Sequence, residues 1–130
     1  MRTLLAFAVL ASPAFAETAL TGDEFEALVT GKTLTFTVND IPYGSEYYAP
    51  DRRVIWAFEG DNCKSGEWYE AQTNDGPAIC FEYEDDDTPK CWQIFSEGDS
   101  FRANYLNRPS SAVLHQATEQ EPLVCGGVGA

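Results

Sequence analysis

Basic side chains are scarce in this 130-residue chain, which has 8 lysines and arginines against 21 aspartates and glutamates and a net charge of −13. Proteins that hold DNA or RNA neutralise phosphates with basic side chains, so this composition argues against a nucleic-acid partner. The sequence also has no apolar run approaching the roughly 18 residues that cross a bilayer. We therefore expect no nucleic-acid partner and no stable membrane insertion.

Histidine and recognisable catalytic motifs are equally scarce. His115 is the only histidine and lies in a weak C-terminal strand pattern. The serines fall in turns without a nucleophile elbow, and no helix pattern follows the C-terminal glycines as a phosphate-binding loop requires. Many carboxylate pairs exist among so many acidic residues, which makes any single pair uninformative. We expect no enzymatic activity, no cofactor and no metal site.

The first sixteen residues have the pattern of a signal peptide. Arg2 supplies the positive start, residues 4–10 the short apolar stretch, and Ala14-Phe15-Ala16 the small residues of a cleavage site. A core helix is the alternative, and Pro13 near its end disfavours it. We predict a signal peptide over residues 1–16, a single domain over residues 17–130 and a periplasmic or secreted location.

The four cysteines all follow this segment, and an even number of cysteines in an exported protein favours disulfides. A zinc site is the alternative, but the chain has no C-x-x-C pair and His115 is too far from the cysteines for a common zinc motif. Four cysteines allow three pairings. Residues 78–83 and 90–95 resemble the arms of a hairpin, and tight closure would place Cys80 opposite Cys91, leaving Cys63 for Cys125.

One helix and a series of short strands are predicted. Thr21 and Glu24 form a capping-box pattern at the start of a helix over residues 20–31, in which Phe25, Leu28 and Val29 share a face. Alternating apolar residues, separated by turn-forming residues, then predict strands. Their ranges are 32–38, 46–49, 53–58, 66–72, 78–83, 90–95, 100–106 and, more weakly, 112–116.

This spacing predicts the fold class. Strands recur without a second helix long enough for a crossover, which is typical of antiparallel, mainly β structure. About eight short strands favour a small up-and-down β-barrel, because closing the sheet removes its exposed edges. We expect the N-terminal helix to cover one mouth of this barrel and two disulfides to stabilise it.

Part of the chain resembles a known group of proteins. The resemblance covers roughly residues 44–95, and the segments that carry it are residues 53–58 (RVIWAF), 60–69, 79–83 and Cys91-Trp92. In these segments the chain is similar to small exported bacterial proteins with lipocalin-like, calycin-type barrels of unsettled function. The resemblance implies the fold rather than an activity, and no catalytic residue carries over from it.

Aromatic residues provide the main candidates for a binding site. An eight-stranded barrel is just wide enough to be filled by its own side chains or to hold one small ligand, so these aromatics either pack the core or line a ligand site. Arg53, Arg102 and Arg108 are among the few cations and could orient an anionic head group at a mouth. The predicted lining residues are Trp56, Phe58, Trp68, Phe81, Tyr83 and Trp92.

An acidic segment at the turn of the hairpin predicted over residues 78–83 and 90–95 gives a second hypothesis. Its carboxylates are Glu82, Glu84, Asp85, Asp86 and Asp87. The spacing lacks the alternating ligands and central glycine of an EF-type calcium loop, and such a segment is often only a solvated turn. With residues 59–62 it could also form a docking surface for a basic protein, such as a lysozyme.

The sequence therefore predicts an exported binding protein without catalytic activity. The leading hypothesis is a barrel that holds a small apolar or amphipathic ligand. The alternative is an acidic interaction or inhibitor protein that captures a basic protein partner.

Overall fold

The computed structural model describes residues 6, 8, 17–117 and 120–125 of the chain. The predicted signal peptide, residues 1–16, lies outside the described residues apart from Ala6 and Ala8. The elements are α1 (Gly22–Val29), β1 (Thr33–Val38), β2 (Ile41–Ala49), β3 (Arg53–Phe58), β4 (Cys63–Thr73), β5 (Gly76–Tyr83), β6 (Asp86–Glu97), β7 (Ser100–Tyr105) and β8 (Val113–Gln116).

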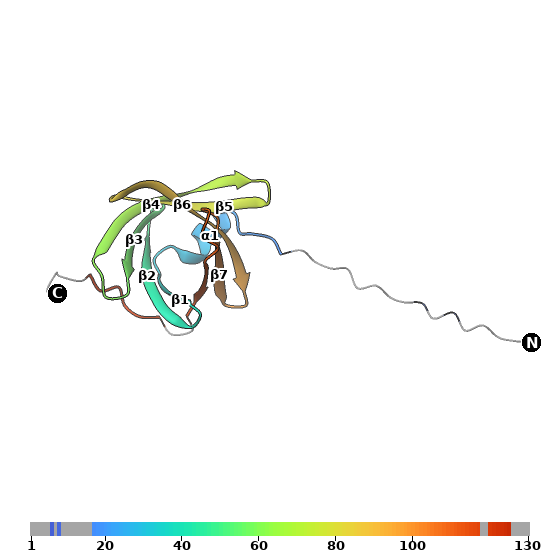
Figure 1. Cartoon of the computed structure of the whole chain (residues 1–130), viewed down its shortest axis with the longest axis horizontal. Coiled ribbons are helices and arrows are strands. Elements are labelled where there is room, and N and C mark those ends of the chain that lie inside the picture. Colours follow the sequence, from blue (N-terminus) through green and yellow to red (C-terminus); the bar gives the residue numbers. More distant parts are fainter. Residues whose placement is uncertain (1–5, 7, 9–16, 118–119, 126–130) are drawn as a thin grey trace, which may run out of the picture.

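The strands form a closed antiparallel barrel, which confirms the predicted fold class. Each strand pairs with the next along the chain, and β8 returns to pair with β1. Figure 1 shows the strands as a ring around α1. Closure leaves no unpaired sheet edge, which a small acidic domain would otherwise have to protect by other means.

The helix begins with the predicted capping box. The Thr21 hydroxyl accepts a hydrogen bond from the Glu24 amide at 3.2 Å, and the Glu24 carboxylate accepts one from the Thr21 amide at 3.0 Å. Arg52, in the turn between β2 and β3, fixes the helix to the barrel through Glu26 at 2.7 Å and Asp23 at 2.9 Å.

The inner face of α1 closes one end of the barrel. Phe25 makes edge-on contacts with Tyr48, Trp68 and Phe101, whose ring centroids lie 5.5, 5.2 and 6.1 Å away. Leu28, expected on the same buried face as Phe25, is instead 41% exposed. An eight-residue helix presents only one narrow stripe of side chains to the barrel. Phe25 and Val29 already occupy that stripe, so Leu28 faces solvent.

Several strands are longer than the sequence predicts. β2 begins at Ile41, so residues 41–44, expected as part of a turn, are strand. The turn consists of Asn39 and Asp40 alone, both with positive φ, as a two-residue hairpin requires. Pro42 is tolerated because the pairing of β1 with β2 shifts register beside it.

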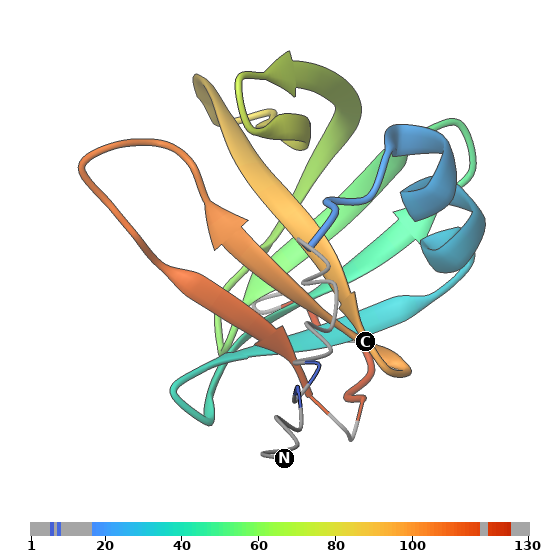
Figure 2. The ribbon, with the colours of Figure 1, turned by 90° about the vertical axis from the view of Figure 1, so that its right-hand side faces the viewer.

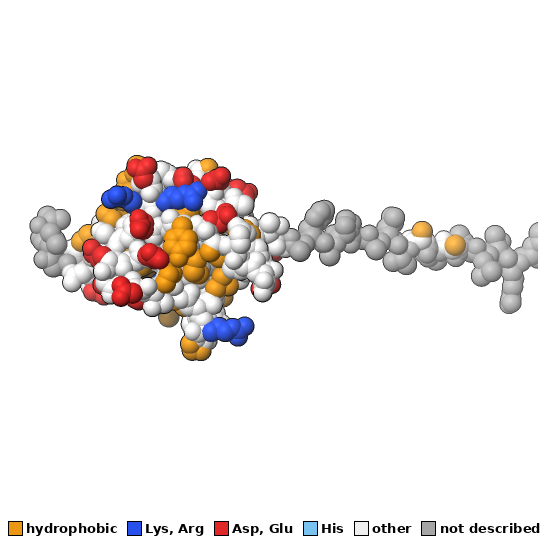
Figure 3. Space-filling view, turned by 90° about the horizontal axis from the view of Figure 1, so that it is seen from above, with side chains coloured by type: hydrophobic (Ala, Val, Ile, Leu, Met, Phe, Trp, Pro, Cys, Tyr) orange, Lys and Arg blue, Asp and Glu red, His pale blue; other side chains and the backbone are white. Residues whose placement is uncertain are grey.

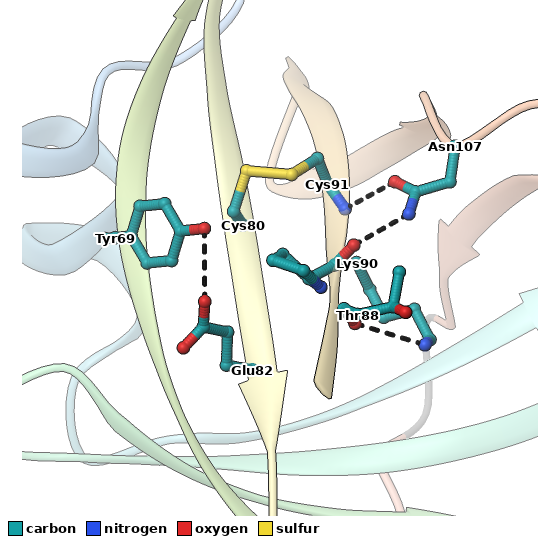
Figure 4. The surroundings of a disulfide bond; sticks show 8 residues. Tyr69, Cys80, Glu82, Thr88, Lys90, Cys91 and Asn107 are labelled. Atoms are coloured by element: carbon teal, nitrogen blue, oxygen red, sulfur yellow. Dashed lines mark hydrogen bonds between the residues drawn. A yellow bond between two sulfur atoms is a disulfide. The ribbon is translucent and has the colours of Figure 1, made fainter. Parts of the chain in front are cut away.

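Both disulfides join the pairs that the hairpin register predicts: Cys80 with Cys91, and Cys63 with Cys125. Cys80 and Cys91 are direct partners on β5 and β6. Figure 4 shows Asn107, in the loop after β7, beside the backbone of Cys91: the Asn107 side chain accepts a hydrogen bond from the Cys91 amide at 3.0 Å and donates one to the Pro89 carbonyl at 2.7 Å.

The second disulfide holds the C-terminal segment against the outside of the barrel. The Glu121 amide donates to the Thr35 hydroxyl at 2.9 Å, and that hydroxyl also hydrogen bonds to Ser45 at 2.9 Å. Thr35 is consequently only 3% exposed, although it lies on the polar face of β1. The inside of the barrel is apolar and aromatic, and it is there that a candidate site lies.

Candidate ligand cavity

A cavity of about 280 Å³ lies inside the barrel. It runs from Phe25, on the inner face of α1, to side chains at the strand ends that lie farthest from the helix. In Figure 2, α1 lies on one side of the barrel and the long loop between β7 and β8 extends on the other. The aromatic residues that line the cavity are Phe25, Phe36, Tyr43, Tyr48, Trp56, Phe58, Phe81, Tyr83, Trp92, Phe101 and Tyr105.

Strand alternation directs these rings inward. Trp56 and Phe58 on β3 are two residues apart, as are Phe81 and Tyr83 on β5, so each pair shares a face of its strand. Gly44 leaves room for the Trp56 ring: a Cβ at this position would lie 2.5 Å from that ring. A side chain larger than hydrogen at residue 44 would therefore clash with the Trp56 ring and with the Ala57 carbonyl oxygen, 2.6 Å away.

The rings nearest the open end contact one another. The Tyr43 centroid lies 5.7 Å from that of Trp56 and 5.3 Å from that of Phe58. On the other wall, Trp92 and Tyr105 lie 4.5 Å apart. The rings thus pack against their neighbours within each wall, and the cavity lies between the two walls.

Of the three carboxylates that line the cavity, Glu46 is the buried one and lies among these rings. It is 3% exposed and sits between its strand partners Leu34 and Trp56. The Tyr83 hydroxyl donates a hydrogen bond to Glu46 Oε2 at 2.5 Å. Tyr48, two residues further along β2, lines the same cavity.

The protonation of this cluster is shifted by its surroundings. Burial raises the pKa of Glu46 to about 7, and the hydrogen bond from Tyr83, together with the nearby Tyr48 hydroxyl, opposes that rise. Burial, followed by the nearby Glu46 charge, raises the pKa of both Tyr48 and Tyr83 well above the ordinary value. The two tyrosines therefore remain donors at neutral pH, and Glu46 is the group whose charge changes there.

Two ion pairs stand at the open end. Lys64 Nζ lies 2.8 Å from Asp85 and 5.4 Å from the Phe58 ring centroid, and Lys90 pairs with Asp86. All four charged side chains border the cavity. Their charges cancel pairwise, so the mouth carries no excess of either sign from these residues.

Five of the six aromatic residues predicted to bind ligand come together in the cavity: Trp56, Phe58, Phe81, Tyr83 and Trp92. Trp68 does not line it; this residue is 4% exposed and packs against Phe25 and Arg52 in the closed end.

Two of the three arginines considered for a mouth, Arg53 and Arg102, do not line the cavity, and the third, Arg108, is exposed in the loop between β7 and β8. Arg53 is exposed at the start of β3, beside the turn that contacts α1. Arg102 lies over the Phe95 ring, 4.7 Å from its centroid, and pairs with Glu17 and Glu97. Both stand near the closed end, because their strands begin there.

The acidic segment is divided by the structure. Asp85 and Asp86 border the cavity and are paired with lysines, whereas Glu82 accepts a hydrogen bond from Tyr69 at 3.4 Å on the outer face. Glu84 accepts a hydrogen bond from the Ser65 amide, and Asp87 is exposed. Figure 3 looks onto the face over β4, β5 and β6 and shows acidic side chains spread around an apolar area.

Sequence reasoning missed Glu46, Tyr43, Lys64 and Lys90 as cavity residues. Glu46 alternates with Tyr48 on a strand, a signal that could have marked it as inward-facing. Tyr43 fell in the segment expected as a turn. The two lysines carry no local signal, since their inward position depends on the register of β4 and β6 with their neighbours.

Compared with known proteins, the chain matches no family model, no curated protein and no solved structure. Among the described residues, no helix has the length and apolar character to cross a membrane. In the same part of the chain, no three His, Cys, Asp or Glu side chains gather in an arrangement that could hold a metal ion. The firm conclusion is structural: the chain is an eight-stranded antiparallel closed barrel with two disulfides, an architecture compatible with calycin-type barrels.

Proposed function

We propose that this protein is an exported, non-enzymatic binding protein that holds one small apolar or amphipathic ligand inside its barrel. The observation that carries the proposal is the cavity of about 280 Å³ with eleven aromatic residues in its wall. Ligand sites are typically concave and apolar, with a few polar groups that orient the ligand. Glu46 and its tyrosine partners match that description.

The energetics favour an apolar body in this space. Each buried methylene contributes about 0.8 kcal/mol, so a chain of several carbons has enough driving force to enter an aromatic lining. The polar cluster around Glu46 would then meet one end of the ligand. Export, the signal peptide over residues 1–16 and membership of a lipocalin-like class of bacterial proteins belong to the same proposal, and the two disulfides favour an oxidising compartment.

A titration with 1-octanol tests the proposal. Trp56 and Trp92 line the cavity and Trp68 does not, so binding should change the fluorescence of the first two. We expect a saturable change that persists in the Trp68→Phe variant, shrinks in Trp92→Phe and is nearly independent of salt. No saturable change in the wild type, together with no adduct in native mass spectrometry, would contradict the proposal.

The alternative is capture of a basic protein by the acidic segment. It gains support from the net charge of −13 and from the exposed carboxylates Glu82, Glu84 and Asp87. It has less local support than the ligand site, because Lys64 and Lys90 neutralise Asp85 and Asp86.

This alternative predicts strong salt dependence. Association with a basic lysozyme should weaken from low to moderate ionic strength and should slow in a variant with Asp85→Asn, Asp86→Asn and Asp87→Asn together. Unchanged association kinetics in that variant, measured by surface plasmon resonance, would count against a charge-driven partner.

A further inference from the structure

We propose that the ligand is an organic cation, a protonated primary or secondary amine on an apolar body, whose ammonium group pairs with Glu46 inside the barrel. This inference rests on the proposed function, and it adds the chemical class of the ligand and the residue that selects it. Its basis is a buried carboxylate without a positive partner in a cavity with aromatic walls.

Glu46 lacks a countercharge. It is 3% exposed, and among the described residues no lysine, arginine or histidine forms an ion pair with it. The lysines that border the same cavity, Lys64 and Lys90, are paired with Asp85 and Asp86. A buried, ionised carboxylate without a partner is costly, and an entering ammonium group supplies the missing charge.

The carboxylate also has acceptor capacity left for a ligand. Its two oxygens offer about four acceptor positions, and the one side-chain hydrogen bond to them among the described residues comes from the Tyr83 hydroxyl. A primary or secondary ammonium group brings both charge and N–H donors to the remaining positions. An alcohol brings a donor without the charge, and a carboxylate would meet Glu46 with the same charge.

The surrounding rings favour a cation as well. Trp56 is the direct strand partner of Glu46, and Tyr43, Tyr83 and Trp92 line the same space. The face of an aromatic ring carries negative electrostatic potential and attracts a desolvated cation. The net charge of −13 adds a long-range field of the same sign, which would concentrate cations near the molecule.

Binding of an amine should be coupled to the proton on Glu46. The amine remains protonated through neutral pH, with a pKa similar to that of lysine. Because the pKa of Glu46 lies at about 7, an entering ammonium below that pH displaces the Glu46 proton into solvent. Affinity for the amine should therefore increase as the pH rises through about 7. The other titratable side chains that face the cavity are Tyr43, Tyr48, Lys64, Tyr83, Asp85, Asp86, Lys90 and Tyr105.

Three molecules with the same carbon chain separate charge from apolar burial: octylamine, 1-octanol and octanoate. In isothermal titration calorimetry with the full mature chain, we expect octylamine to bind at least about tenfold more tightly than octanol, and octanoate to bind most weakly. Below neutral pH, octylamine binding should also release a proton, detected as a dependence of the heat on buffer ionisation enthalpy, whereas octanol binding should not.

The decisive variant is Glu46→Gln, with Glu67→Gln as its matched control. Both replace a carboxyl group by a neutral amide, but Glu67 is exposed on the outer face of β4 and does not line the cavity. Glu46→Gln should lose the preference for amine and the proton release and still bind octanol. Glu67→Gln should keep both. Octanol binding by Glu46→Gln also shows that the variant is folded.

Two outcomes would overturn the inference, and they are distinguishable. If octanol or octanoate binds as tightly as octylamine, or if Glu46→Gln retains the amine preference, the cavity binds ligand but Glu46 does not select a cation. If none of the three molecules binds the wild type, the proposed function fails together with the inference.

Discussion

The two ends of this barrel are built from similar residues and behave differently. At the closed end, Phe25 from α1 fills the space between Tyr48, Trp68 and Phe101. At the open end, aromatic rings of comparable size contact one another along the walls and leave a cavity. No element plays the role of α1 there within the described residues. Aromatic content alone therefore does not decide between a packed core and a binding site. The helix decides it, because it fills only one end of the barrel.

The largest effect should come from emptying the closed end. Phe25 is 1% exposed, and Phe25→Ala should lower the free energy of unfolding by about 3–5 kcal/mol, because it removes a large buried ring and leaves a void. Leu28→Ala on the outer side of the same helix should change stability by no more than about 0.5 kcal/mol. Urea unfolding measures both, and equal costs would contradict the division of α1 into a buried and an exposed face.

The pH dependence of stability should come next in size and reports on the open end. Burial raises the pKa of Glu46 from its ordinary 4.5 to about 7, so the folded protein holds this proton more tightly than the unfolded chain. That contribution is complete below pH 4.5 and is lost as the pH rises through about 7. Relative to Glu46→Gln, the wild type should thus lose up to about 3 kcal/mol of stability across this range. If the free energy of unfolding varies with pH in the same way for the wild type and Glu46→Gln, Glu46 is not desolvated in the folded protein.

A smaller effect should follow loss of the helix cap that positions Phe25. Thr21→Ala removes the hydroxyl that accepts from the Glu24 amide and should cost about 1 kcal/mol in thermal or urea unfolding. Thr18→Ala, at an exposed position outside α1, is the matched control and should have little effect. If both variants cost the same, the capping box does not hold the helix in place.

The smallest effect is expected at the rim. Asp85 is 48% exposed on its side chain, and its pair with Lys64 should contribute no more than about 1 kcal/mol. Asp85→Asn should therefore leave the unfolding midpoint nearly unchanged. A large loss of stability would mean that the open end depends on its ion pairs, as the closed end depends on Phe25.

Much of the fold could be predicted from the sequence because its signals are local. Alternation fixed the face of Trp56 and Phe58, the capping box located α1, and the register of one hairpin brought Cys80 opposite Cys91. These features require only neighbours along the chain or across one turn. The same local pattern placed five of the six predicted aromatics in the cavity.

The rest of the site depends on information that no local pattern contains. Trp68 alternates like the other aromatics but meets Phe25 because α1 fills its end of the barrel. Arg53 and Arg102 were considered as head-group contacts at a mouth because cations are scarce, and scarcity says nothing about which end of the barrel a residue occupies. Glu46 was one of 21 acidic residues, and only closure of the barrel distinguishes it from the exposed ones.

A nuclear magnetic resonance spectrum of the three tryptophan indole groups, recorded during titration with 1-octanol, distinguishes the two ends of the barrel directly. We expect the Trp56 and Trp92 signals to move and to show intermolecular contacts with octanol methylenes, while the Trp68 signal stays nearly fixed, because only the first two border the cavity. Contacts to Trp68 instead, or no shift of any indole signal, would contradict a barrel that is filled at one end and open to a ligand at the other.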